Sequence, residues 1–519
     1  MTQAGRILQM RLDGLAEAMQ RMLLDTAVSP VAREAADCAS ALFTAGGELL
    51  AMSEAIPLLL GALPGQVQAL FARYPAEGMR EGDLFLANDP YSGGTHLPDI
   101  AVMLPVFAQG RLIGVAASLL HHQDIGGTRP GSVPPDATEI AQEGLRLPVM
   151  RAGADHRLSE EMRGLIAANS RVPQTVLADL DAQIAASLTA VTGLGRIVGD
   201  LGVDGFLHAA AELLDRGEAE TLAALAGLAR AEARATDGLD PDAALGTSSV
   251  SVRLTVTPKG LSADFTGSSP QVPAPINCVA SGTLSALLYA MLTLLPEGAP
   301  RNGGLLRCLR LVLPQASVVN AAPPAPVNAR TNMVRAITST VLAALAGMDP
   351  KRRPAANCGM AYVIAFSGQG PDGARFLATE IVAGGAGGGP DAPGAHGTST
   401  DVGNARNTPV EIIEAELPIR MISAERRRGS GGAGRFPGGD GVRRVYEALS
   451  DGIAVSIRGE RFQRVPEGSA GGGAPKPAAA QIRRAGGAVE ILGPRSAVVL
   501  DRGDRLIVES CGGAGYGAA

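Results

Sequence analysis

The sequence predicts an α+β protein of several lobes, with mixed sheets, a helical middle segment and a glycine-rich, β-rich C-terminal region. Residues 249–257 alternate between apolar and polar side chains, which is typical of a half-buried strand. Residues 157–235 are rich in Ala, Leu, Asp, Glu and Arg and poor in Gly, which favours long helices. Residues 360–519 place glycines between short apolar runs, and no repeating βαβ spacing indicates a doubly wound sheet.

The length of 519 residues exceeds that of one ordinary domain. We therefore expect four regions: an α+β region that holds the candidate site, a helical region, a second α+β region and the glycine-rich region. Their predicted bounds are 1–156, 157–240, 241–350 and 351–519.

The first region is predicted to begin with an amphipathic helix over residues 5–26, where Leu and Met recur every three or four positions. Two apolar runs around a glycine-containing loop then indicate a β-hairpin. A short helix and three strands complete the region. The predicted ranges are 40–44 and 48–52 for the hairpin, 66–73 for the helix, and 83–87, 100–107 and 112–120 for the strands.

Helical and strand-like patterns alternate in the remaining regions, with a linker-like break at residues 236–246. The predicted helices span 173–193, 205–233, 280–295 and 331–347. The predicted strands lie within 248–266 and at 375–382, 409–417, 442–449, 453–458 and 497–509.

The composition argues against several classes of function. The net charge is −6 and no Lys/Arg run is long enough to follow a phosphate backbone, so we expect no nucleic-acid partner. No run of about 18 apolar residues is free of charge, so we expect no membrane span. The five cysteines lie far apart without metal-binding spacing, which favours a reduced protein of the cytoplasm.

Half of the histidines gather in one short segment. Of six histidines, three fall within 27 residues, namely His96, His121 and His122. His96 and Asp99 follow one predicted strand, His121 ends another, and Asp37 stands at the entrance of the hairpin. Because imidazole and carboxylate groups together bind Zn²⁺, Mn²⁺ or Fe²⁺, we expect Asp37, His96, Asp99 and His121 to hold a divalent cation. The alternative is that these side chains only cap loops through hydrogen bonds.

Three residues near this group are candidates for proton transfer. His122 and Asp124 follow His121 directly, and imidazole titrates near neutral pH. Glu143 lies four residues after Glu139, so that on a helix the two carboxylates would share one face. One of them could act as a general base toward water. A solvated helical turn is the alternative for this pair.

Four further residues are expected to contact a substrate. Thr95 precedes the first histidine of the group, and Arg129 lies in the loop 126–132, whose backbone could form an anion-binding nest. That loop lacks the GxxxxGK[ST] pattern of a nucleotide-binding loop. His396 and Arg406 follow a dense glycine run and are predicted to form a wall on the substrate side. Simple turns and local hydrogen bonds are the alternatives.

Several long motifs closely resemble the hydantoinase B/oxoprolinase family, and they run in family order from about residue 5 to 517. They are NDPY (88–91), GGTHLPD (93–99), HHQDIGG (121–127), PPD (134–136), QEGLR (142–146), NARNTP (404–409) and SGGAGR (430–435).

The resemblance implies a metal-dependent subunit of an ATP-dependent enzyme that opens a small cyclic amide, such as a lactam, a hydantoin or an imide. It implies a hetero-oligomer with a hydantoinase A-type subunit, which binds ATP and Mg²⁺. The metal ligands of the family match Asp37, His96, Asp99 and His121. Relatives also carboxylate ketones, so a carboxylase subunit is one alternative. A non-catalytic subunit that stabilises the ATPase partner is another.

Two departures from the family pattern leave the substrate open. Many members have a histidine in the loop after the hairpin, where residues 56–61 of this chain read IPLLLG. The common aromatic residue after Asp37 is replaced by Cys38.

Overall fold

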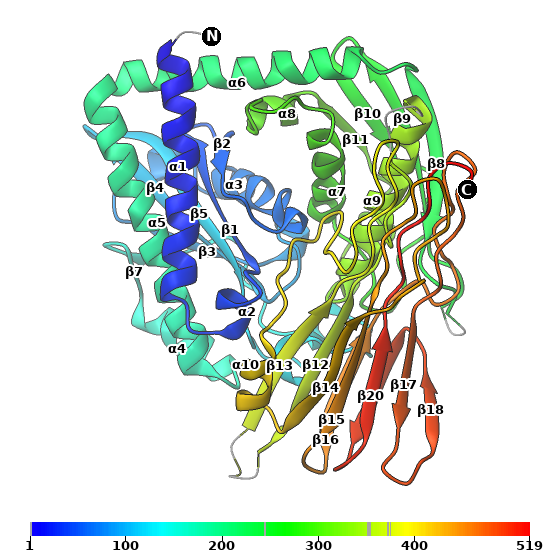
Figure 1. Cartoon of the computed structure of the whole chain (residues 1–519). Coiled ribbons are helices and arrows are strands. Elements are labelled where there is room, and N and C mark those ends of the chain that lie inside the picture. Colours follow the sequence, from blue (N-terminus) through cyan, green and yellow to red (C-terminus); the bar gives the residue numbers. More distant parts are fainter. Residues whose placement is uncertain (1–2, 243–244, 350–353, 371–372, 374) are drawn as a thin grey trace.

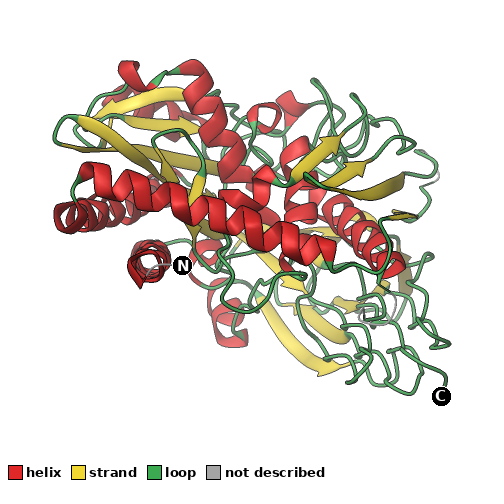
Figure 2. Cartoon of the chain, turned by 90° about the horizontal axis from the view of Figure 1, so that it is seen from above, coloured by secondary structure: helices red, strands yellow, loops and turns green. Residues whose placement is uncertain are grey.

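The structure, a computed structural model, describes residues 3–242, 245–349, 354–370, 373 and 375–519. It confirms the predicted α+β class, since the described residues form four separate sheets with helices packed on them (Figure 1). Helices make up much of the N-terminal and middle parts of the chain, whereas the C-terminal end lies among strands and loops (Figure 2).

The first sheet has seven antiparallel strands in the order β2-β1-β5-β4-β3-β6-β7. The predicted hairpin and the three predicted strands are confirmed as five neighbouring strands of this sheet, from β2 at its edge to β3. The side chains of β4 and β5 are almost all buried because both faces of this sheet are covered. The strands span Cys38–Thr44 (β1), Leu49–Met52 (β2), Leu84–Ala87 (β3), Asp99–Ala108 (β4), Arg111–His121 (β5), Met150–Ala154 (β6) and Arg157–Leu158 (β7).

Helices cover the two faces of this sheet. On one face lie α1 (Gln3–Thr26), which confirms the predicted first helix, and α5 (Pro173–Leu201). On the other face lies α3 (Ala62–Arg73). Leu42 of β1 shares a core with the first pair, and its neighbour Phe43 shares a core with α3. The two cores follow from the alternation of side chains along a strand. Two short helices, α2 (Pro30–Arg33) and α4 (Glu160–Asn169), complete this region.

One described helix, α5, is long and apolar enough to cross a membrane, judged by length and composition. The sequence rule missed it because that rule required a run without charge, and Asp179 and Asp181 interrupt this one. In the structure α5 packs against the first sheet. Its buried Gln183 donates hydrogen bonds to the carbonyls of Ile100 and Ser118, which lie in β4 and β5.

The second sheet has the order β11-β10-β9-β8, and helices pack against it. α6 (Val203–Ala226) ends earlier than the predicted residue 233, because Gly227 caps it and the chain then enters β8. The predicted helices at 280–295 and 331–347 are confirmed as α7 (Ala280–Leu292) and α9 (Arg330–Met348). The remaining elements are α8 (Gly303–Arg307), β8 (Glu232–Gly238), β9 (Ser249–Thr257), β10 (Gly260–Asp264) and β11 (Leu309–Val312).

Two further sheets, of orders β13-β12-β16-β19 and β14-β15-β20-β17-β18, share one apolar core. Phe366 and Tyr446 meet there across the two sheets, with ring centroids 5.3 Å apart. The strands span Tyr362–Gln369 (β12), Arg375–Val382 (β13), Ile419–Arg426 (β14), Val442–Ala448 (β15), Ile453–Arg458 (β16), Ala479–Arg483 (β17), Val489–Leu492 (β18), Arg495–Leu500 (β19) and Arg505–Glu509 (β20).

The predicted strand at 409–417 is wrong. Residues Val410–Glu416 form the helix α10, which begins after Pro409. The helix buries Ile413 and exposes its three glutamates, an arrangement that suits a helical period better than the period of a strand.

Glycine-rich segments pack side by side at the C-terminal end of the molecule, outside the named strands. Backbone hydrogen bonds link them in series: Gly432 donates to Gly513, Gly513 to Gly439, and Gly439 to Ala386, over 2.8–2.9 Å. A Cβ on Gly513 would lie 1.9 Å from the Ala386 carbonyl oxygen, so only glycine permits this approach. The segments are 384–389, 429–441, 468–473 and 511–517.

Candidate metal centre

The predicted ligands meet where three neighbouring strands of the first sheet begin or end. Asp99 begins β4 and lies opposite His121, the last residue of β5. Asp37 precedes β1, and its carbonyl accepts the backbone N–H of His121 at 3.0 Å. His96 enters from the loop before β4, where the Asp99 N–H donates to the His96 carbonyl at 3.1 Å. Residues from three separate segments therefore meet, and we call these four the His–Asp cluster.

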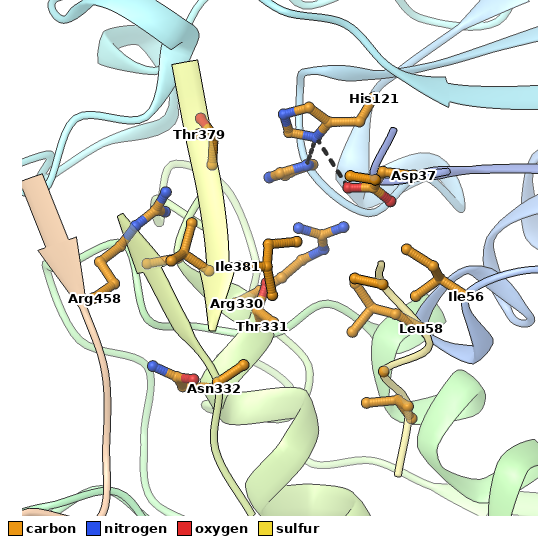
Figure 3. A pocket seen from close by; sticks show the side chains of 18 of the residues that line it. Asp37, Ile56, Leu58, His121, Arg330, Thr331, Asn332, Thr379, Ile381 and Arg458 are labelled. Carbon is orange, nitrogen blue, oxygen red and sulfur yellow. Dashed lines mark hydrogen bonds and ion pairs between the residues drawn. The ribbon is translucent and has the colours of Figure 1, made fainter. Parts of the chain in front are cut away.

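The ligand atoms of three members converge on one point. His96 Nε2 lies 2.9 Å from Asp99 Oδ1 and 3.0 Å from His121 Nδ1. His121 Nδ1 lies 3.0 Å from Asp99 Oδ1. Asp37 faces this group at longer range, with Oδ2 3.9 Å from His121 Nδ1. Figure 3 shows Asp37 and His121 side by side, with the Arg330 side chain below them.

Neighbouring side chains orient the cluster. His96 Nδ1 lies 3.1 Å from the Asn328 carbonyl oxygen, which can only accept, so Nδ1 carries the proton and Nε2 carries a lone pair. Arg330 Nη2 donates to Asp99 Oδ2 at 2.7 Å, and Thr95 Oγ1 donates to the same oxygen. Asp99 Oδ1 is therefore the oxygen that faces both histidines.

The donor chemistry fits a divalent cation. The His96 Nε2 lone pair points at a carboxylate oxygen and at an imidazole nitrogen, and such acceptor groups repel one another unless a cation lies among them. Zn²⁺, Mn²⁺ and Fe²⁺ accept imidazole and carboxylate ligands. Ligands at about 2.0–2.2 Å from one ion lie about 3 Å apart at octahedral angles and about 3.4 Å apart at tetrahedral angles, close to the spacing in the cluster.

Burial sets the protonation of the cluster. Burial lowers the pKa of His96 to about 3, so this imidazole is neutral at pH 7. Burial opposes ionisation of Asp99, but the Arg330 guanidinium, which donates to Oδ2, helps to hold the pKa of Asp99 well below its ordinary value. Burial raises the pKa of Asp37, although His121 lies beside it. A cation would favour the charged form of this buried carboxylate.

A cavity of about 80 Å³ opens beside the cluster, between three parts of the chain. The first sheet contributes Asp37 and His121, and α9 contributes Arg330. The C-terminal strands contribute Ile381 of β13 and Arg458 of β16. The labelled side chains in Figure 3 surround this space from these three directions. The cluster therefore borders a space in which a small molecule can bind.

The sequence matches the family model described as hydantoinase B/oxoprolinase over residues 4–519. The chain belongs to the hydantoinase B/oxoprolinase family. It is 31% identical over 507 residues to an uncharacterised protein of Methanocaldococcus jannaschii, covering 97% of this chain and 88% of that one. It is 30% identical over 522 residues to a 5-oxoprolinase of Dictyostelium discoideum, covering 98% of this chain but only 39% of that longer protein.

A solved structure gives the same picture. The ATP-dependent caprolactamase from Pseudomonas jessenii matches with a TM-score of 0.91 at 26% sequence identity, over 99% of this chain and 91% of that one. The resemblance inferred from the motifs is thereby confirmed at the level of the hydantoinase B/oxoprolinase family.

Two of the predicted proton-transfer residues lie away from the cavity. His122 is buried on the α5 side of the first sheet, where its Nε2 lies 2.9 Å from Gln183 Oε1. Asp124 accepts backbone N–H groups of Gly126 and Gly131 and pairs with Arg171 at 2.9 Å. These contacts order a loop, so the positions do not support the predicted role of His122 and Asp124 in proton transfer.

Glu143 is buried and Glu139 is exposed, so the two carboxylates do not share a face. The segment between them is a single 3-10 turn, Ile140–Gln142. Glu143 Oε1 accepts the backbone N–H groups of Val327 and Asn328, each at 2.9 Å. Burial raises the pKa of Glu143 to about 8. Glu143 therefore supports the loop that presents Asn328, rather than lining the cavity as the predicted base would.

The four predicted substrate contacts are placed differently. Thr95 is buried behind Asp99 and holds that carboxylate. Arg129 is exposed and pairs with Asp136 at 2.8 Å. His396 Nδ1 accepts the backbone N–H of Asp440 at 2.8 Å, and Arg406 is exposed. Arg129, His396 and Arg406 are not among the described residues that line the cavity, so their predicted role is not supported.

Sequence reasoning missed several polar residues that line the cavity, among them Asn328, Arg330 and Arg458. Both arginines are nearly inaccessible to solvent, with exposed fractions of 2% and 7%. One signal was available, because Arg330 and Arg335 fall in a helix whose other residues are mostly apolar. Fully buried arginines are rare unless they are paired or functional.

Proposed function

We propose that this chain is the metal-dependent subunit of an ATP-dependent amidohydrolase that opens a cyclic amide such as a lactam, a hydantoin or an imide. The observation that carries the proposal is the convergence of His96 Nε2, Asp99 Oδ1 and His121 Nδ1 within 3.0 Å of one another beside a cavity. The relatives named 5-oxoprolinase and caprolactamase support the class of substrate.

The cluster would hold Zn²⁺, Mn²⁺ or Fe²⁺ through His96, Asp99 and His121, with Asp37 as the fourth ligand. When bound, such a cation supplies Lewis acidity toward an amide carbonyl and lowers the pKa of water toward about 7. The protein positions the ligands: Asn328 fixes the tautomer of His96, and Thr95 and Arg330 hold one oxygen of Asp99.

The cavity wall suits an organic ring. Ile56, Leu58, Val402 and Ile381 line it with apolar side chains. These side chains pack against a ring and reduce the water around it. The polar groups that could orient a ring amide come from the cluster and from the start of α9.

ATP is assigned to a partner. Residues 126–132, the glycine loop nearest the cluster, do not follow the pattern of a nucleotide-binding loop. The Dictyostelium 5-oxoprolinase is a longer protein of which this chain spans 39%. We infer that a hydantoinase A-type subunit, with ATP and Mg²⁺, supplies the missing activity in a cytoplasmic hetero-oligomer.

The test uses the chain co-expressed with a hydantoinase A-type subunit. Ring opening of 5-oxoproline, hydantoin and caprolactam is followed with and without ATP, and the metal content is measured by plasma mass spectrometry. We expect ATP-dependent opening of at least one ring, and loss of activity in His96→Ala while the complex still assembles. Arg129→Gln, on the exposed surface, is the matched control.

The same assay separates the alternatives. Full activity of the His96→Ala complex would mean that this subunit is only structural. Consumption of bicarbonate with a ketone, without opening of any ring amide, would make the complex a carboxylase.

A further inference from the structure

The cavity has an excess of positive charge. Three guanidinium groups line it, those of Arg330, Arg335 and Arg458. Among the described lining residues, Asp37 supplies the carboxylate. Arg330 is neutralised by Asp99 at 2.7 Å. Arg335 donates to the Thr400 carbonyl at 3.0 Å. Arg335 and Arg458 both lack a carboxylate partner among the described residues, and Arg458 is the one whose Nη1 donates to Asn328, the residue that also contacts His96.

The contacts of Arg458 leave one edge of its guanidinium free. Arg458 is 7% exposed, and its Nη1 donates to Asn328 Oδ1 at 2.7 Å. Its buried Nε has no hydrogen-bond partner among the described residues. The Nε and Nη2 atoms form the edge with which arginine binds two oxygens of a carboxylate or phosphate.

A buried polar group without a partner is costly, and the Nε atoms of Arg330 and Arg335 in the same cavity also lack one among the described residues. The buried Asn332 Oδ1 has no hydrogen-bond partner among the described residues. Glu143 is the buried carboxyl group that acts electrostatically on Arg458. Burial raises the pKa of Glu143 to about 8, so it is mostly protonated at pH 7 and does not neutralise Arg458. Burial lowers the pKa of Arg458 to about 10, so this side chain stays charged at pH 7.

We propose that the free edge of Arg458 binds an anionic oxygen group of the substrate, so that this chain selects a cyclic amide carrying a carboxylate or a phosphoryl group over an uncharged ring. Asn328 places the two centres relative to each other, because its side chain holds Arg458 and its carbonyl holds His96. Figure 3 shows Arg458 on the side of the C-terminal strands and His121 on the side of the first sheet. This inference rests on the proposed function.

The test is binding of three probes to the full chain, measured by isothermal titration calorimetry without turnover. The probes are 5-oxoproline, its uncharged analogue 2-pyrrolidone, and inorganic phosphate. We expect 5-oxoproline to bind at least about tenfold more tightly than 2-pyrrolidone. Arg458→Gln should remove this preference and leave 2-pyrrolidone binding unchanged, and Arg458→Lys should keep part of it. Arg129→Gln, the exposed control, should bind like the unmodified chain.

The outcomes separate the two anions and the two proposals. Binding of phosphate that depends on Arg458, without binding of 5-oxoproline, would identify a phosphoryl group as the anion. Equal binding of the charged and uncharged rings by the unmodified chain, or binding of no probe, would overturn the inference, and this comparison needs no variant to fold. If the complex opens rings equally well with Arg458→Gln, the proposed function stands and the inference fails.

Discussion

Arg330 holds Asp99 from a position 231 residues further along the chain, with Nη2 2.7 Å from Oδ2 and both side chains buried. This pair joins the start of α9 to the start of β4. The helix α9, which packs against the second sheet, therefore helps to fix the geometry of ligands that come from the first sheet and its loops. Thr95 shares the task, since its hydroxyl donates to the same oxygen.

Thr95→Val should weaken metal binding without removing a ligand. Valine keeps the shape of the buried side chain but loses the hydroxyl that orients Asp99. Groups that orient metal ligands typically contribute about 10–100-fold in affinity. Competition with a chelator, read by plasma mass spectrometry, should show a loss in this range, and a larger loss in His96→Ala. Unchanged affinity in Thr95→Val would mean that Arg330 alone suffices to hold Asp99.

Glu143→Gln should flatten the dependence of stability on pH. The folded pKa of about 8 lies above the ordinary value of 4.5, so the folded state holds a proton that the unfolded state releases. This contribution to stability is complete below pH 4.5 and is lost as pH rises through 8. Glutamine keeps the acceptor for Val327 and Asn328 and has no proton to lose.

Chemical denaturation at about pH 6 and about pH 9 checks this expectation. The free energy of unfolding of the unmodified chain should fall between the two values more than that of Glu143→Gln. Glu139→Gln, at an exposed position, should behave like the unmodified chain. Equal slopes for Glu143→Gln and the unmodified chain would contradict the assignment.

Gly513→Ala should strongly destabilise the C-terminal part of the chain. The added Cβ would lie 1.9 Å from the Ala386 carbonyl oxygen, and a backbone atom cannot move aside as the end of a side chain can. We expect a loss of at least about 3 kcal/mol, or insoluble protein. Gly493→Ala is the control, since a Cβ there meets nothing within 4 Å, and its effect should stay within about 0.5 kcal/mol.

Ala405→Phe should separate substrate binding from metal binding. Ala405 lines the cavity and makes no hydrogen bond to the His–Asp cluster. A phenyl group at this position would fill space that a ring needs. The metal content should stay at the level of the unmodified chain while ring opening falls. Ala415→Phe, on the exposed face of α10, is the control. Full activity of Ala405→Phe would show that the ring binds elsewhere.

The strands that carry the cluster could be predicted from sequence because each ends where an apolar run meets a polar residue. Two consecutive strands joined by a short turn then set Asp99 opposite His121 by register alone. The same rule would have excluded His122. Neighbouring residues at a strand end point to opposite faces, and His121 already occupied the cavity face.

The contribution of the later regions could not be predicted. Arg330 and Arg458 reach the cavity only because α9 and β16 pack near the first sheet. No local sequence pattern predicts this packing. The error at α10 has a different origin. The segment Val410–Glu416 is too short for the period to be decided from the sequence alone, and length is what normally separates a strand from a helix.

All four residues of the His–Asp cluster lie within the first 121 positions, whereas Arg458 is made much later. During synthesis, the proposed cation ligands therefore leave the ribosome well before the arginine that is proposed to bind an anion. Because Arg330, which holds Asp99, is also made later, we expect the cluster to reach its final geometry only after α9 has packed against the first sheet.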